Sequence, residues 1–149
     1  MEEWRAVVGY EGLYEASSRG SIRSLPRRTP HYLGGTVVRG GKLLKGCLQN
    51  GYRQVSLSKQ GKTHTYHVHT LVARAFLGVR PVGMLVCHRD GKKPNNNKAN
   101  LRYAYPQGNS DDMKAHGTVL RGERHGYAKM TDRRVRRLRA LAGAETRSA

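Results

Sequence analysis

Polar and hydrophobic positions alternate in short runs over the first third of the chain. The stretch YEASSRGSIRSL, residues 14–25, is interrupted at Arg19 and Gly20, which predicts a β-hairpin that turns there. The stretch HYLGGTVVRGGKLLKG, residues 31–46, has paired glycines and isolated basic residues and is too interrupted for a helix. Residues 1–48 are therefore predicted to form a small β-rich segment whose stability depends on the next segment or on its ligand. Its expected core is Trp4, Tyr10, Leu13, Tyr14, Ile22 and Leu25.

The pattern is strongest between about residues 49 and 116. The stretch GYRQVSLSKQGKTHTYHVH, residues 51–69, predicts two strands that turn around Lys59 to Lys62. Hydrophobic residues then fall at helical spacing in HTLVARAFLG, residues 69–78, where Gly78 ends the helix. A buried strand at 84–87, a long polar loop and a second strand at 100–105 follow. Pro106 is placed to begin another helix, so the predicted order is strand, loop, strand, helix.

The last segment, residues 117–149, begins with a glycine-rich stretch and ends in one predicted helix. Thr131 is suited to cap its first turn. Val135, Leu138 and Ala142 form an apolar stripe along it, and arginines fill the other faces. These arginines are Arg133, Arg134, Arg136, Arg137 and Arg139.

The charge of the chain narrows the class of partner. The 149 residues include 28 Lys and Arg against 10 Asp and Glu, which gives a formal net charge of +18. Such an excess favours a polyanionic partner, and nucleic acid fits better than a membrane because no apolar run approaches the roughly 20 residues that span a bilayer. The acidic start does not resemble a secretory signal, so we expect a cytoplasmic protein. Cys47 and Cys87 are expected to be reduced thiols.

One polar stretch combines residues that suit hydrolytic chemistry. His88 ends a predicted strand, where a neutral imidazole can take a proton from water and act as a general base. Asn109 lies one turn into the next helix, from which its amide oxygen can point toward the same spot as His88 and bind a hard cation such as Mg²⁺ or Mn²⁺. Asn100 precedes the second strand and can brace the intervening loop through hydrogen bonds.

These motifs resemble a known family. The runs VHTLVARAF (68–76) and VCHRDGKKPNNNKANLRYAYPQGN (86–109) resemble the HNH nuclease domain of phage and intron-encoded homing endonucleases. Residues 2–25 resemble the small module that often precedes it. The resemblance implies an α+β fold with a ββα-metal core. It also implies three parts: a β-rich DNA-binding module at 1–48, the nuclease domain at 49–116, and a basic tail with one helix at 117–149.

The resemblance also implies roles for individual residues. His88 would activate the attacking water, Asn100 would orient the loop that carries the histidine, and Asn109 would be a ligand of a divalent metal, Mg²⁺ or Mn²⁺. The family has an aspartate immediately before the histidine as a second ligand, whereas this chain has Cys87. A thiol suits Mg²⁺ poorly. Carboxylates that could compensate are Asp90, Asp111 and Asp112.

The predicted activity is metal-dependent hydrolysis of double-stranded DNA by a phage-type nuclease that is monomeric and acts in the cytoplasm of a host bacterium. Phosphate contacts are expected to dominate binding. The candidate DNA-binding residues are Arg19, Arg23, Arg27, Arg28, Arg89, Lys92, Lys93, Arg102, Arg133, Arg134 and Arg137.

Three alternatives stay open from the sequence. The Cys87 departure is compatible with a DNA-binding protein derived from an HNH nuclease but without catalysis. The small size and strong charge also suit an RNA-binding protein, although no aromatic stacking platform is evident. Finally, a zinc site could draw on His64, His67, His69, Cys87 and His88, although their spacing matches no common zinc finger. Outside that possibility, His69 is interpreted as structural.

Overall fold

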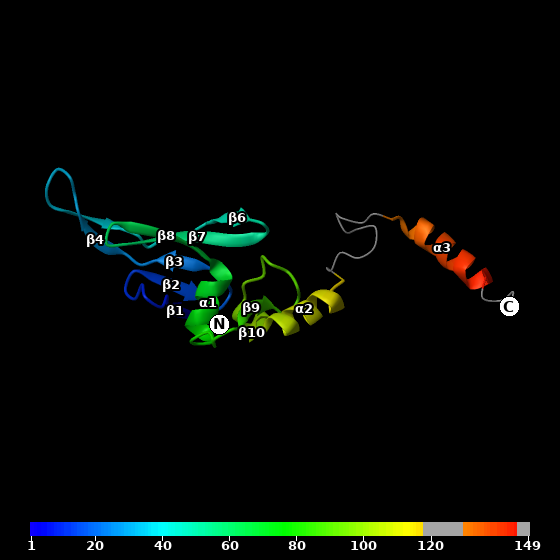
Figure 1. The fold of residues 1–149 in the computed structure, drawn as a ribbon. Coiled ribbons are helices and arrows are strands. Elements are labelled where there is room, and N and C mark those ends of the chain that lie inside the picture. Colours follow the sequence, from blue (N-terminus) through cyan, green and yellow to red (C-terminus); the bar gives the residue numbers. More distant parts are fainter. Residues whose placement is uncertain (118–129, 146–149) are drawn as a thin grey trace. The chain divides into compact units, whose positions relative to one another are not determined.

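The computed structural model describes residues 1–117 and 130–145, and the chain divides into two units, Met1–Asp112 and Met113–Ala149. Each unit is described by itself (Figure 1). The strands are β1 (Trp4–Ala6), β2 (Tyr14–Ser17), β3 (Ile22–Ser24), β4 (Arg27–Pro30), β5 (Thr36–Arg39), β6 (Cys47–Gln49), β7 (Tyr52–Lys59), β8 (Lys62–His67), β9 (Leu85–His88) and β10 (Leu101–Ala104). The helices are α1 (Val68–Phe76), η1 (Lys98–Asn100), α2 (Pro106–Ala115) and α3 (Asp132–Glu145).

Four small antiparallel sheets make up the strands of the first unit. Two have three strands, in the orders β1-β2-β3 and β6-β7-β8, and two are hairpins, β4-β5 and β9-β10. The predicted turn at Arg19 and Gly20 joins β2 to β3, and the predicted hairpin around Lys59 to Lys62 joins β7 to β8. Both predictions are confirmed. The short strands β1 and β6 were not predicted, since each offers only three residues of pattern.

Helix α1 lies at the centre of the hydrophobic core. Its apolar face packs with residues from β2, β3, β7 and β10, so the N-terminal strands and the later hairpin share one cluster. The members of this cluster with no more than 1% exposure are Val7, Ala16, Ile22, Leu57, Val68, Val72 and Ala73. Of the six core residues predicted for the first segment, Tyr10, Tyr14 and Ile22 are buried, and the other three are partly exposed. The first segment therefore packs against α1 to complete its hydrophobic core, as the small number of predicted core residues indicated.

The order strand, loop, strand, helix is also confirmed. Leu101 pairs with His88 and Ala104 with Leu85 in the antiparallel β9-β10 ribbon, and α2 begins at Pro106. Gly78, with φ of 85°, directly follows the last residues of α1 and ends the helix in the left-handed conformation that glycine adopts most easily.

In the second unit, the described part contains α3. The backbone N–H of Arg134 donates to Thr131 Oγ1 at 3.2 Å, which is the predicted cap. Val135 is half-buried, Leu138 is 48% exposed, and Arg133, Arg134 and Arg137 are exposed. No helix in the described part of the chain is both long and apolar enough to cross a membrane.

The turn between β2 and β3 fits tightly against the loop between β9 and β10. Gly20 has φ of 92°, and a Cβ added there would lie 2.7 Å from the backbone carbonyl of Asn96. Two further contacts support the same junction: the N–H of Lys98 donates to Ser18 O at 2.9 Å, and Lys98 forms an ion pair with Glu3. The N-terminal module thus holds the polar loop from one side.

Gly20→Ala is expected to destabilise the first unit. Its matched control is Gly9→Ala, because Gly9 also has positive φ, 87°, but nothing lies within 4 Å of the added Cβ. Both variants carry the left-handed strain of about 1–2 kcal/mol. Gly20→Ala should lose roughly 1–3 kcal/mol more, because it also overpacks the junction. Urea unfolding followed by circular dichroism measures the difference, and equal losses in the two variants would contradict the tight junction.

Candidate active site

His88 is the last residue of β9 and its side chain is buried, with a relative exposure of 9%. Its Nε2 lies 3.2 Å from Oδ1 of Asn96, which is itself 3% exposed. An amide oxygen can only accept, so in the tautomer that makes this hydrogen bond Nε2 carries the proton and Nδ1 has the free electron pair. The sequence did not single out Asn96, which is one of three consecutive asparagines in an apparently ordinary loop.

Aromatic rings surround the imidazole of His88. The ring of His69, from the second position of α1, lies edge-on at 5.2 Å between centroids, and the ring of Tyr52 lies at 6.2 Å. His67 stacks on the other side of His69 at 5.1 Å. His69 Nδ1 and Asn96 Nδ2 are both buried and have no hydrogen-bond partner among the described residues. His69 is therefore close to the candidate base, although the sequence suggested only a structural role.

Asn100 braces the loop that follows His88. Its Oδ1 accepts from the backbone N–H of Asp90 at 3.0 Å, and its Nδ2 donates to Asp90 Oδ1 and to Asn95 O, each at 2.8 Å. Burial acts to raise the pKa of Asp90, but hydrogen bonds from Asn95, Lys92 N and Asn100 outweigh it and lower the pKa to about 2. The Asp90 carboxylate is thus ionised and accepts hydrogen bonds from within its own loop.

Cys87 and Asn109 meet on the other face of the β9-β10 ribbon. Successive side chains of a strand point to opposite faces, so Cys87 faces α2 while His88 faces α1. The thiol Sγ donates to Asn109 Oδ1 at 3.3 Å. Burial raises the pKa of Cys87, which favours the neutral thiol. The structure brings Cys87 and Asn109 together and gives His88 a different set of neighbours.

Of Cys87 and Asn109, only Asn109 suits a hard divalent cation. Asn109 offers a hard oxygen atom, but a neutral buried thiol is a poor ligand for Mg²⁺. Asp112, which could have compensated, forms an ion pair with Arg102. Within residues 1–117 and 130–145, no group of three or more His, Cys, Asp or Glu side chains is arranged to hold a metal ion, so the zinc alternative gains no support.

The predicted DNA-binding cations differ in their surroundings. Arg23 forms an ion pair with Glu15 and covers the Trp4 ring at 4.2 Å, so it is partly used within the fold. Lys93 covers the Tyr52 ring at 4.6 Å and donates to Asn50 O. Arg27 is half-buried over the Tyr14 ring. Among the other predicted DNA-binding cations of the first unit, Arg19, Arg28, Arg89 and Lys92 are exposed.

The stability of the fold should depend on pH through His69. Burial, helped by His88 and His67, lowers its pKa from 6.5 to about 4. Between these values the unfolded chain binds a proton at residue 69 that the folded chain excludes, so the free energy of unfolding falls as pH falls from 6.5 towards 4. His69→Gln should flatten this fall in urea unfolding across that range, whereas His64→Gln, at an exposed position of β8, should keep it. An unchanged pH dependence in His69→Gln would contradict the assignment.

Comparison with known proteins adds independent findings. Residues 2–58 match the model of the NUMOD4 motif, and residues 66–110 match the model of an HNH endonuclease. The chain is 32% identical over 133 residues to the DNA endonuclease I-HmuI of Bacillus phage SP01, which covers 89% of this chain and 69% of that protein. A relative named only as an HNH endonuclease, from Acanthamoeba polyphaga mimivirus, is 32% identical over 129 residues, and the chain spans 35% of its length.

A solved structure agrees with these matches. It describes DNA binding and cleavage by the HNH homing endonuclease I-HmuI, and it superposes with a TM-score of 0.62 at 35% identity. The alignment covers 78% of this chain and 60% of that one. The ribbon, loop and helix around His88 lie within the region that matches the HNH endonuclease model.

Proposed function

Since the chain belongs to the HNH homing endonuclease family, we propose that it is a metal-dependent endonuclease that hydrolyses phosphodiester bonds of double-stranded DNA. The observation that carries this proposal is the contact between His88 Nε2 and the buried Asn96 oxygen, which orients the imidazole at the end of β9. The names of the relatives point to the same chemistry, since one is a DNA endonuclease and the solved structure concerns DNA cleavage.

His88 acts as the general base in this proposal. Its neutral imidazole takes a proton from water at Nδ1, and the resulting hydroxide attacks phosphorus in line with the departing 3′ oxygen. Asn96 orients the ring, and the positive charge formed on the imidazole strengthens the hydrogen bond to the Asn96 oxygen. The bond between phosphorus and the 3′ oxygen breaks, and the departing 3′ oxygen takes a proton from solvent water. The expected products therefore carry 5′-phosphate and 3′-hydroxyl ends. Asn100 holds the loop that positions Asn96, through its contacts with Asp90 and Asn95.

Asn109 is the residue that we propose as a ligand for the divalent cation, with Cys87 beside it. When bound, such an ion stabilises negative charge on the phosphate oxygens. The Asn109 oxygen now accepts the Cys87 thiol proton, so an ion at this position competes with that hydrogen bond. We therefore expect weak metal affinity and a preference for Mn²⁺ over Mg²⁺, because the smaller Mg²⁺ demands near-ideal oxygen geometry.

DNA binding in this proposal comes mainly from cations that have no carboxylate partner among the described residues. Arg19 lies in the turn between β2 and β3, and Arg28 lies in β4. Arg89 and Lys92 lie in the loop after His88, and Arg133, Arg134 and Arg137 lie on α3. Figure 1 shows the β4-β5 hairpin extending away from the rest of the first unit, as a two-stranded ribbon that a major groove can admit. Arg23 and Arg102 contribute less, because each is paired with a carboxylate.

A DNA-binding protein without catalysis is the second candidate. The observation that favours it is the hydrogen bond from the Cys87 thiol to Asn109, which occupies the only hard ligand atom that this pair offers. Conversion of supercoiled plasmid to nicked or linear forms, in Mg²⁺ and in Mn²⁺, separates the two candidates. Absence of conversion in both metals, with DNA binding intact, would favour the second.

His88→Ala is expected to abolish plasmid cleavage, with a loss of at least about 100-fold, because it removes the general base. DNA affinity in a mobility-shift assay should change little, since a neutral imidazole contributes no charge to phosphate binding. His64→Ala, an exposed histidine on β8, is the matched control and should cleave normally. Cleavage by His88→Ala at the wild-type rate would remove the base assignment.

Cys87→Asp is expected to lower the Mg²⁺ concentration needed for half-maximal cleavage, because it replaces a soft neutral ligand with a hard anionic one. Asn109→Ala should raise the required concentration. Metal titrations of the initial cleavage rate test both changes, with Cys47→Asp as the control at an exposed cysteine. Unchanged metal dependence in both site variants would exclude Cys87 and Asn109 as the cation site.

A further inference from the structure

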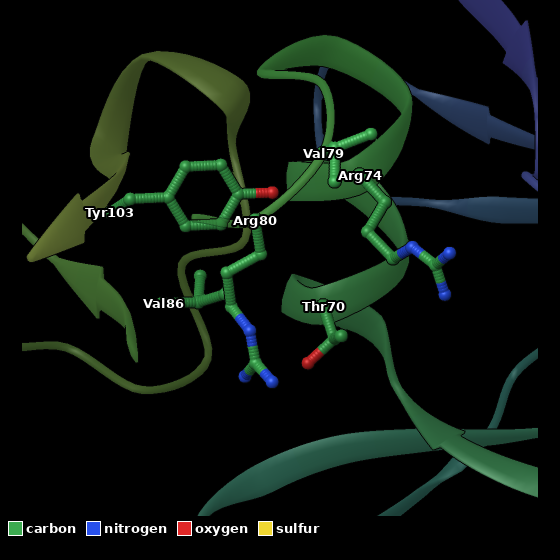
Figure 2. A pocket seen from close by; sticks show the side chains of 6 residues that line it. All are labelled: Thr70, Arg74, Val79, Arg80, Val86 and Tyr103. Carbon is green, nitrogen blue, oxygen red and sulfur yellow. The ribbon is translucent and has the colours of Figure 1, made fainter. Parts of the chain in front are cut away.

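A hollow of about 270 Å³ lies between α1 and the β9-β10 ribbon (Figure 2). It is lined by Thr70, Arg74, Val79, Arg80, Val86 and Tyr103. None of these residues was assigned a role from the sequence or in the proposed mechanism. The hollow is smaller than the sites that hold drug-sized molecules, and it combines an apolar side with two arginines, which suits a small anionic group.

The polar groups of the hollow are not equivalent. The Tyr103 hydroxyl donates to Gly78 O at 2.8 Å and is thus committed to the end of α1. Arg80 and Thr70 line the same hollow, and in Figure 2 both side chains extend toward the lower part of the view, whereas the guanidinium of Arg74 extends away to the right. No ion pair or side-chain hydrogen bond is formed by Arg74, Arg80 or Thr70 with the described residues.

No carboxylate among the described residues therefore pairs with the positive charges of Arg74 and Arg80. Burial raises the pKa of Tyr103, while Arg74 and Arg80 act to lower it, so both cations act electrostatically on the ring that lines the hollow. Arg80 is exposed in the connection between α1 and β9, and Thr70 is half-buried on α1. A guanidinium beside a hydroxyl can together donate several hydrogen bonds to the oxygens of one phosphate.

The hollow lies on the same face of the ribbon as the candidate base. Val86 and His88 are two residues apart on β9, so their side chains point to the same face, separated by roughly 7 Å along the strand. The cross-strand partners Tyr103 and Leu101 belong to that face as well. The hollow therefore neighbours His88 along this face of the ribbon.

We propose that this hollow binds a backbone phosphate of DNA close to the phosphodiester presented to His88, with Arg80 as its charged ligand and Thr70 as a hydroxyl donor. The assignment of this phosphate to a DNA strand rests on the proposed function. The proposal that the hollow binds a phosphate group does not. Arg80 and Thr70 are thus positioning residues that fix the register of the substrate relative to the base.

Inorganic phosphate is the first probe, because it tests the site without any cleavage. In ¹⁵N-labelled protein, phosphate should shift the Thr70 amide and the Arg80 Nε–H signals more than sodium chloride of equal ionic strength does. Arg80→Gln should remove the Thr70 shift, Thr70→Val should reduce the Arg80 Nε–H shift, and Arg74→Gln should reduce either shift less than Arg80→Gln does. Equal shifts in chloride, or a Thr70 shift that survives in Arg80→Gln, would overturn the site.

Duplex DNA is the second probe. The logarithm of affinity should fall against the logarithm of salt concentration with a slope of roughly −5 to −7 for six to eight neutralised phosphates. Arg80→Gln should reduce this slope by about 1 and weaken binding alike on different sequences, whereas Arg74→Gln should change it by less. Thermal melting of each variant confirms folding. An unchanged slope in Arg80→Gln, or an equal loss in Arg74→Gln, would overturn the assignment to a DNA phosphate.

The two proposals fail in different ways. If the wild type binds DNA with the Arg80-dependent slope but cuts in neither Mg²⁺ nor Mn²⁺, the endonuclease proposal fails and the phosphate site stands. If the wild type cuts DNA and Arg80→Gln retains the wild-type slope and cleavage rate, the phosphate site fails and the endonuclease proposal stands.

Discussion

The contact between the turn at Gly20 and the backbone of Asn96 is the constraint on which the rest of the candidate site depends. Only a residue without a Cβ fits there, because an added Cβ would lie 2.7 Å from the Asn96 carbonyl. Asn96 in turn holds the imidazole of His88. A turn in the N-terminal module thus supports the residue that orients the candidate base, and the shared hydrophobic core around α1 keeps the two parts in register. The N-terminal strands therefore support the candidate site directly, in addition to their part in the shared core.

Strand alternation places the two groups of candidate site residues on opposite faces of the β9-β10 ribbon. One face carries His88 with the rings of His69 and Tyr52 and the hollow beside Arg80, and the other carries Cys87 against Asn109. Proton transfer and phosphate positioning are therefore proposed for one face, and the cation for the other. The departure at Cys87 affects only the second face. A change in cation affinity can thus leave the base and its supports intact.

Charge is distributed unevenly in this strongly basic chain. With 10 acidic residues against 28 Lys and Arg, most cations cannot be paired internally. Several carboxylates in the described part of the chain pair with particular cations: Glu15 pairs with Arg23, Asp112 with Arg102, and Glu3 with Arg5 and Lys98. Cations such as Arg80 and Arg28 have no such partner in the described part of the chain. Their positive potential is available to a polyanion, which is the electrostatic basis of the proposed DNA binding.

The sequence by itself determined the local elements, because alternation, helical spacing and glycine or proline at element ends act over a few neighbouring residues. These patterns predicted the turn at Arg19 and Gly20, helix α1, the order of ribbon and helix around His88, and the cap at Thr131. The sequence also singled out Asn100 and Asn109, whose roles as brace and ligand stay predictions. Only the tertiary structure decided that Asn96, His69 and Tyr52 surround His88, and that Arg80 and Thr70 share a hollow. Those contacts join residues from different elements, and no periodicity in the chain records which side chains meet when separate elements pack together.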